Sequence, residues 1–121
     1  MRIYKHRLFL KWAKKEAITD QMIKAAVAEM VNGLIDADLG SGLFKKRIAM
    51  PGKGKRGSYR TLLAYQADEK AIFVYGFSKN QADNISPSDK KVLKKLAMQL
   101  LEMGEGQLIG LVKTGILYEV T

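Results

Sequence analysis

The chain has 121 residues, 47% of them hydrophobic, and a formal net charge of +9. This length allows one hydrophobic core and is too short for two ordinary domains, so we expect a single domain spanning residues 1–121. The absence of cysteine excludes disulfides and thiolate metal sites, and the single histidine excludes zinc sites built from several histidines. We therefore expect neither a metal nor another cofactor.

The charge and hydropathy pattern bears on partners and location. An excess of basic residues favours a polyanionic partner, which could be nucleic acid, the ribosome or an anionic membrane surface. No apolar run approaches the length of a membrane span, and basic residues interrupt the apolar residues near the N-terminus, unlike a signal-peptide core. We therefore expect a cytoplasmic protein without a membrane partner.

The first third of the chain predicts a short strand at residues 2–5, a helix at 7–17 and a second helix that ends near residue 34. The inner face of the first helix would be formed by Leu8, Trp12 and either Ala17 or Ile18. Thr19 is a suitable N-cap for the second helix, with Asp20 in its first turn. Apolar residues of the second helix recur at three- and four-residue spacing: Met22, Ile23, Ala26, Val27, Met30, Val31 and Leu34.

The middle of the chain has the pattern of strands. Residues 43–49, 58–65 and 71–77 are rich in β-branched and aromatic residues. The connections at 51–57 and 66–70 are too short for crossover helices, so the three strands should form an antiparallel meander.

The last part of the chain predicts a helix that Ser86 caps, with Pro87 and Asp89 in its first turn. Its buried stripe would be formed by Val92, Leu93, Leu96, Ala97, Leu100 and Leu101. A short helix at 107–113 and a strand at 116–120 follow. The order of elements indicates an α+β fold in which an N-terminal strand and helical hairpin pack on an antiparallel meander, with a C-terminal helix.

The most informative segment is residues 43–65, which contains seven of the 21 basic residues and lies in an acid-free stretch between Asp38 and Asp68. The seven are Lys45, Lys46, Arg47, Lys53, Lys55, Arg56 and Arg60. Strand alternation would place Lys45 and Arg47 on one face of a sheet and Lys46 on the other. Such a face could bind a phosphate chain.

Two groups around these strands are candidates for RNA binding. Lys53, Lys55 and Arg56 lie in a glycine-rich connection without the Walker pattern, so they would either grip RNA backbone non-specifically or form a solvated basic hairpin. Tyr59 and Tyr75 could stack unpaired bases, although strand aromatics are more often part of a core. Lys46 is a further, weaker candidate.

Three short motifs follow one another along the strands: KKR at 45–47, GSYR at 57–60 and GFSK at 76–79. Their order and spacing, together with the segment 25–40 and the helix after Ser86, resemble the RelE/HigB-type toxins of bacterial type II toxin–antitoxin systems, in the RelE/ParE superfamily. The resemblance implies a RelE-like fold and a small mRNA interferase that cuts messenger RNA on the ribosome and inhibits translation. It also implies neutralisation by a cognate antitoxin, which we expect to be of the helix-turn-helix DNA-binding type.

Metal-independent RNA cleavage uses the 2′-hydroxyl as the nucleophile, so the enzyme must align the attack and stabilise the added charge on the phosphate. We predict Arg60, Lys79, Lys45 and Arg47 as the catalytic residues. Two of these residues could instead have no catalytic role: Arg60 could form a structural ion pair with Asp83, and Lys79 could be a solvated loop residue. Some family members carry an Arg, His or Tyr soon after the last motif, but residues 80–85 hold none, which leaves the general acid undetermined.

Two other functions remain open. A ParE-like relative would share the fold and poison DNA gyrase, although the dense Lys/Arg strand argues against it. A non-catalytic RNA- or ribosome-binding protein would have the same charge but would leave no cleaved RNA ends.

Overall fold

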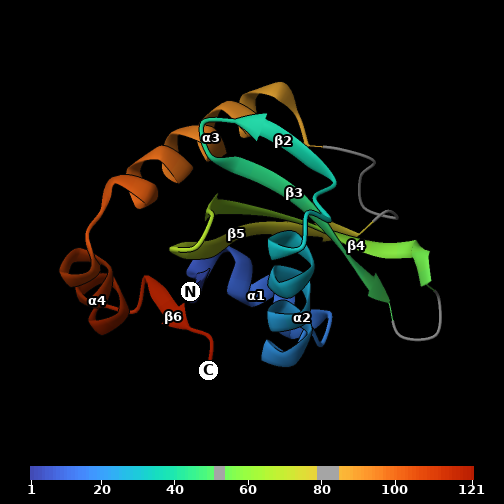
Figure 1. The fold of residues 1–121 in the computed structure, drawn as a ribbon, viewed down its shortest axis with the longest axis horizontal. Coiled ribbons are helices and arrows are strands. Elements are labelled where there is room, and N and C mark those ends of the chain that lie inside the picture. The colour runs from blue at the N-terminus through green and yellow to red at the C-terminus, as the bar shows by residue number, and fades with distance from the viewer. Residues whose placement is uncertain (51–53, 79–84) are drawn as a thin grey trace.

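The computed structural model describes residues 1–50, 54–78 and 85–121 and confirms the predicted α+β class (Figure 1). The elements, in chain order, are β1 (Arg2–His6), α1 (Arg7–Lys15), α2 (Asp20–Val31), β2 (Ala37–Gly40), β3 (Leu43–Met50), β4 (Gly54–Gln66), β5 (Lys70–Ser78), α3 (Pro87–Glu102), α4 (Glu105–Lys113) and β6 (Leu117–Glu119).

The strands form one six-stranded sheet in the order β2-β3-β4-β5-β1-β6. Strands β3, β4 and β5 form the predicted antiparallel meander. Strand β1 pairs parallel to β5, and β6 closes the edge by pairing antiparallel to β1. Because β1 and β5 are far apart in the chain, no turn signal could have indicated this pairing.

Strand β2 was not predicted, since its polar sequence resembled the end of the preceding helix. It pairs with β3 through a tight turn in which Gly40, Ser41 and Gly42 have φ values of 91°, 58° and 80°. Two glycines allow this left-handed backbone without steric cost. The turn therefore adds one more strand to the basic side of the sheet.

Helices cover both faces of the sheet (Figure 1). The face that packs against α1 and α2, here called the hairpin face, contributes Ile48, Tyr59, Leu63 and Phe73 to one core cluster. The opposite face packs against α3 and α4 through a second cluster. The residues of this second cluster on the meander strands are Leu43, Leu62, Ala64, Ile72, Val74 and Phe77.

The helix phases differ from the predictions at several positions. In α1 the buried residues are Phe9 and Ala13, whereas Leu8 is 55% exposed. The prediction for Leu8 was wrong because the cap at His6 sets the phase of the helix, and this phase turns Phe9 toward the sheet. Trp12 is partly buried against the same core, as expected.

In α2 the predicted positions Ile23, Ala26, Val27 and Met30 are buried. Val31 and Leu34, at 55% and 56% exposure, are not, because α2 ends at Val31 and Gly33 (φ 90°) turns the chain away. In α3, Leu93, Ala97 and Leu100 are buried as predicted, and Leu96 and Leu101 pack partly buried against the same cluster. Val92, at 66% exposure, does not belong to this stripe.

The predicted caps are confirmed. The Thr19 hydroxyl accepts a hydrogen bond from the Met22 N–H at 3.2 Å, and the Ser86 hydroxyl accepts one from the Asp89 N–H at 3.2 Å. These bonds satisfy donors that a helix N-terminus otherwise leaves unpaired. Within the described ranges, none of the helices is both long and apolar enough to cross a bilayer.

Candidate functional site

The sheet register brings the basic strand residues together in two rows. Arg47 on β3 stands directly opposite Arg60 on β4, which in turn stands opposite Phe77 on β5. The neighbouring row runs from Lys45 through Leu62 to Tyr75. Since directly paired residues point to the same side of a sheet, these side chains share one face.

We call the part of this face formed by Lys45, Arg47, Arg60, Tyr75 and Phe77 the basic face. It lies on the same side of the sheet as α3, and Phe77 belongs to the core cluster that packs against this helix. The Arg47 side chain is 46% exposed, Tyr75 is 36% exposed, and Lys45 and Arg60 are half-buried. Phe77 is buried, at 4% exposure, between these side chains and the core.

A β-bulge places Tyr75 on the basic face. Leu62 pairs with Tyr75 and Leu63 pairs with Phe73, so Val74 is an extra residue in β5. In a regular strand, residues 73 and 75 would point to the same face, so the bulge is what turns Tyr75 away from the hairpin face that Phe73 occupies. The Tyr75 and Phe77 rings lie 6.1 Å apart at 44°.

Arg60 is held by the backbone of its own strand. Its Nη1 donates a hydrogen bond to the Ser58 carbonyl at 2.9 Å. No carboxylate in residues 1–50, 54–78 or 85–121 forms an ion pair with it. The alternative partner, Asp83, lies outside the described residues. Within the described residues, the Ser58 carbonyl is thus the side-chain contact of Arg60, which has further guanidinium donors that could bind an external anion.

Lys46 lies on the other face, as strand alternation predicts, and is buried at 1% exposure. Its Nζ is 2.7 Å from Glu29 Oε1 and donates a hydrogen bond to the Leu34 carbonyl at 3.0 Å. These contacts tie the end of α2 to β3. Because this ammonium group is not accessible to a polyanion, we withdraw Lys46 as a candidate RNA-binding residue.

Tyr59 is also part of the core rather than the surface. It is 8% exposed, its ring packs edge-on against Trp12 at 5.6 Å, and its hydroxyl donates to the Glu16 carbonyl at 3.3 Å. A base cannot stack on a ring buried in this way, so we withdraw Tyr59 as well. The Trp12 indole also lies over residue 76. This position requires glycine, because a Cβ there would come within 2.2 Å of the ring.

The remaining predicted residues are only partly described. Lys53 and Lys79 lie outside the described residues. The predicted connection at 51–57 is shorter than expected, because β4 begins at Gly54 and brings Lys55 and Arg56 into the strand. Lys79 directly follows Ser78, the last residue of β5.

The single histidine has a structural role. His6 is buried, and its Nδ1 accepts a hydrogen bond from the Leu8 N–H at 3.1 Å as the N-cap of α1. Burial, with a smaller contribution from the Arg7 charge, lowers the pKa of His6 below its ordinary value. The Nδ1 atom of the imidazole is thus committed to the helix cap.

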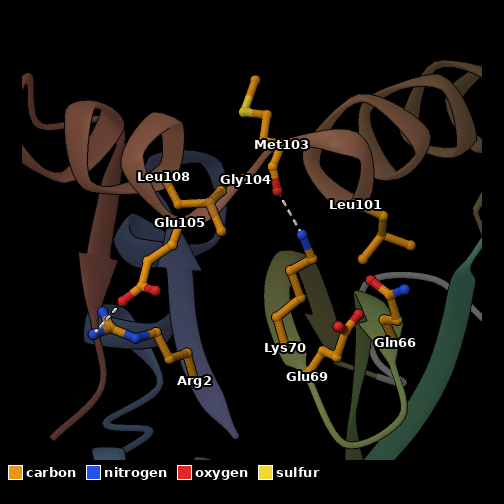
Figure 2. Close-up of a pocket in the computed structure, with 9 residues that line it drawn as sticks. All are labelled: Arg2, Gln66, Glu69, Lys70, Leu101, Met103, Gly104, Glu105 and Leu108. Atoms are coloured by element: carbon orange, nitrogen blue, oxygen red, sulfur yellow. Dashed lines mark hydrogen bonds and ion pairs between the residues drawn. The ribbon is translucent and has the colours of Figure 1, made fainter.

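A separate cavity of about 480 Å³ lies at the opposite end of β4 and β5, beside the α3–α4 junction (Figure 2). Its cations are already engaged, since Arg2 contacts Glu105 at 2.8 Å and Lys70 Nζ donates to the Met103 carbonyl at 2.6 Å. These contacts fasten α4 and its linker to the sheet. In the described part of the chain, no cluster of three or more His, Cys, Asp or Glu residues could hold a metal ion.

A six-stranded mixed sheet with a helical hairpin on one face, a C-terminal helix on the other and basic strands beside that helix defines the RelE-like class of α+β domains. A family model, described as the RelE toxin of the RelE/RelB toxin–antitoxin system, matches residues 1–120. The chain therefore belongs to the RelE toxin family. A search of curated proteins found no match.

Proposed function

We propose that this toxin is an mRNA interferase that cleaves messenger RNA on the ribosome through attack of the 2′-hydroxyl on the adjacent phosphate. The observation that carries the proposal is the direct pairing of Arg47, whose side chain is 46% exposed, with the half-buried Arg60. Like charges directly opposite on a sheet are destabilising. Such a pair suits a surface that binds an anion between its two cations.

The proposed roles follow from the positions of the cations. Arg60 would bind non-bridging oxygens of the scissile phosphate, because its planar fork of donors matches a phosphate and can stabilise the charge of the phosphorane. Arg47 would bind the same or the neighbouring phosphate from β3. Lys45, one row away, would hold the next part of the backbone. We retain Lys79, which follows β5, as the proposed group that holds the leaving oxygen.

We propose that lysine or the ribosome transfers the protons, since Nδ1 of His6 is engaged in the cap of α1. A lysine whose pKa is lowered by neighbouring cations can act as a general base or acid. Alignment alone supplies a large part of the rate of intramolecular attack, and a bound ribosome would supply an aligned substrate.

Tyr75 provides the proposed contact with a base. Its ring is exposed next to the row of cations and is supported by Phe77. Stacking of one base on an aromatic ring contributes about 1–3 kcal/mol. We propose that Lys53, Lys55 and Arg56 add non-specific contacts with the RNA backbone.

Membership of a toxin–antitoxin family makes an antitoxin the natural partner. We propose that this antitoxin is a small DNA-binding protein of the helix-turn-helix type, encoded beside the toxin, and that both act in the cytoplasm. The antitoxin would restore growth when the two proteins are produced together.

Induced expression in bacteria tests the proposed function. We expect the wild type to stop growth and to create new 5′ ends inside coding sequences, whereas Arg60→Ala should do neither. Lys11→Ala is the matched control, since it removes one positive charge from the exposed side of α1 on the other face of the sheet. Growth arrest without new mRNA ends, accompanied by loss of gyrase supercoiling activity, would instead support a ParE-like toxin.

A further inference from the structure

We propose that Asp36 is a positioning residue that fixes Arg47 for phosphate binding. This inference rests on the proposed function of the basic face. Asp36 is one of the two acids that border the acid-free stretch on its N-terminal side, in a segment whose sequence resembles a helix-ending turn. Only the pairing of β2 with β3 reveals that it lies beside Arg47.

The carboxylate of Asp36 holds Arg47 at two points. Its Oδ2 accepts a hydrogen bond from the Arg47 backbone N–H at 2.7 Å, and its Oδ1 lies 3.7 Å from Arg47 Nε. The Asp36 backbone N–H also donates to the Lys45 carbonyl at 3.2 Å. Asp36 thus extends the pairing with β3 beyond the start of β2. Its carboxylate, rather than a backbone carbonyl, accepts the hydrogen bond from the Arg47 N–H.

The same carboxylate is fixed from the hairpin face. Lys46 Nζ lies 4.0 Å from Asp36 Oδ2 and is itself held by Glu29 and by the Leu34 carbonyl. The Asp36 side chain is only 22% exposed. A carboxylate that is confined by a buried ammonium group on one side can hold a guanidinium on the other without losing its own position.

Positioning matters because Arg47 faces another cation. Without Asp36, repulsion by Arg60 would push the Arg47 guanidinium away, and its several rotamers would have to be ordered again when RNA binds. With Asp36, the charge of Arg47 is partly balanced while 46% of its side chain stays exposed to a ligand. Asp36 therefore acts through Arg47 and need not touch RNA.

A double-mutant cycle tests this role. Asp36→Asn keeps the size of the side chain and an acceptor for the Arg47 N–H but removes the charge. We expect this change to lower the kcat of ribosome-dependent cleavage by about 10- to 100-fold, with little change in KM. In an Arg47→Ala background the same change should have almost no further effect. Glu102→Gln is the control, because it removes one exposed negative charge from the end of α3.

Multiplicative losses from the two substitutions would overturn the positioning role, as would a loss of the same size in Glu102→Gln. If the wild type does not cleave mRNA, the proposed function fails. The double-mutant cycle is then measured with the dissociation constants of the same variants for a 2′-O-methyl RNA 12-mer. Non-additive binding losses would still support the role of Asp36. Additive losses, or a wild type that does not bind this oligonucleotide, would overturn it.

Discussion

Two neighbouring lysines offer a sharp test, because the structure places them in opposite environments. Lys46 is buried on the hairpin face and paired with Glu29, whereas Lys45 is half-buried on the basic face. Methionine is a suitable replacement for both, since it keeps most of the length of the side chain and removes the charge. Lys46→Met should therefore affect stability, and Lys45→Met should affect RNA binding.

The expected cost follows from the contacts. Lys46→Met removes an ion pair at 2.7 Å and a hydrogen bond to the Leu34 carbonyl at 3.0 Å. Removing one partner of a fully buried ion pair costs about 3–5 kcal/mol. Because the Glu29 side chain is 43% exposed and can regain water, the free energy of unfolding should fall by somewhat less, about 2–3 kcal/mol. Lys45→Met should change it by less than about 0.5 kcal/mol.

Urea unfolding followed by circular dichroism measures both variants. We expect the midpoint to fall by about 1–2 M urea for Lys46→Met and to stay near the wild type for Lys45→Met. Lys45→Met, in contrast, should weaken binding of an RNA oligonucleotide and reduce the salt dependence of that binding by the contribution of about one phosphate contact. Equal destabilisation by the two changes, or RNA binding by Lys45→Met that matches the wild type, would refute the assignment of the two faces.

Three further predictions concern other parts of the fold. Gly76→Ala should destabilise the protein by about 1–3 kcal/mol, because the new Cβ would come within 2.2 Å of the Trp12 ring; an unchanged melting temperature would contradict that packing. The lowered pKa of His6 means that the unfolded chain takes up the proton first as the pH falls, so stability is full above about 6.5 and is lost as the pH falls through the folded-state pKa. This loss should be smaller in His6→Asn, where an amide oxygen can replace Nδ1 as the acceptor of the cap. If the melting temperatures of the wild type and His6→Asn depended on pH in the same way, the burial of a neutral His6 would be refuted. Tyr75→Ala should weaken RNA binding about 5- to 100-fold while Tyr75→Phe should not, and equal binding by all three proteins in a fluorescence anisotropy titration would exclude the stacking contact.

The fold could be predicted to the extent that local signals determine it. Alternating apolar residues gave the meander, and Thr19 and Ser86 gave the helix starts. The phase of α1 could not be predicted, because Leu8 and Phe9 are both apolar and the packing of Phe9 on Phe73 of β5 is a long-range contact.

The candidate site depends on the register in which β3, β4 and β5 pair, and this register could not be predicted from the sequence. Strand alternation separated Lys45 and Arg47 from Lys46, and the structure confirms this separation. The pairing of Arg47 with Arg60 depends on how the chain turns between β3 and β4. The exposure of Tyr75 depends on a bulge that exchanges the faces of β5. Neither feature has a local sequence signal.

The burial of Lys46 had no local signal either. Its partners Glu29 and Asp36 both precede β2 in the chain, and a lysine within a basic strand resembles any other surface lysine. Only the packing of α2 on β3 shows that this cation is used to hold the fold.

The paired arginines of the basic face are proposed to support cleavage of mRNA through attack of the 2′-hydroxyl. Purified protein incubated with ribosomes that carry a defined mRNA tests this role most directly, with the chemistry of the RNA ends as the readout. We predict 2′,3′-cyclic phosphate and 5′-hydroxyl ends with the wild type, in the presence of EDTA, and a rate at least 100-fold lower with Arg60→Ala. Intact mRNA with the wild type, or equal rates for the two proteins, would contradict this role of the arginines.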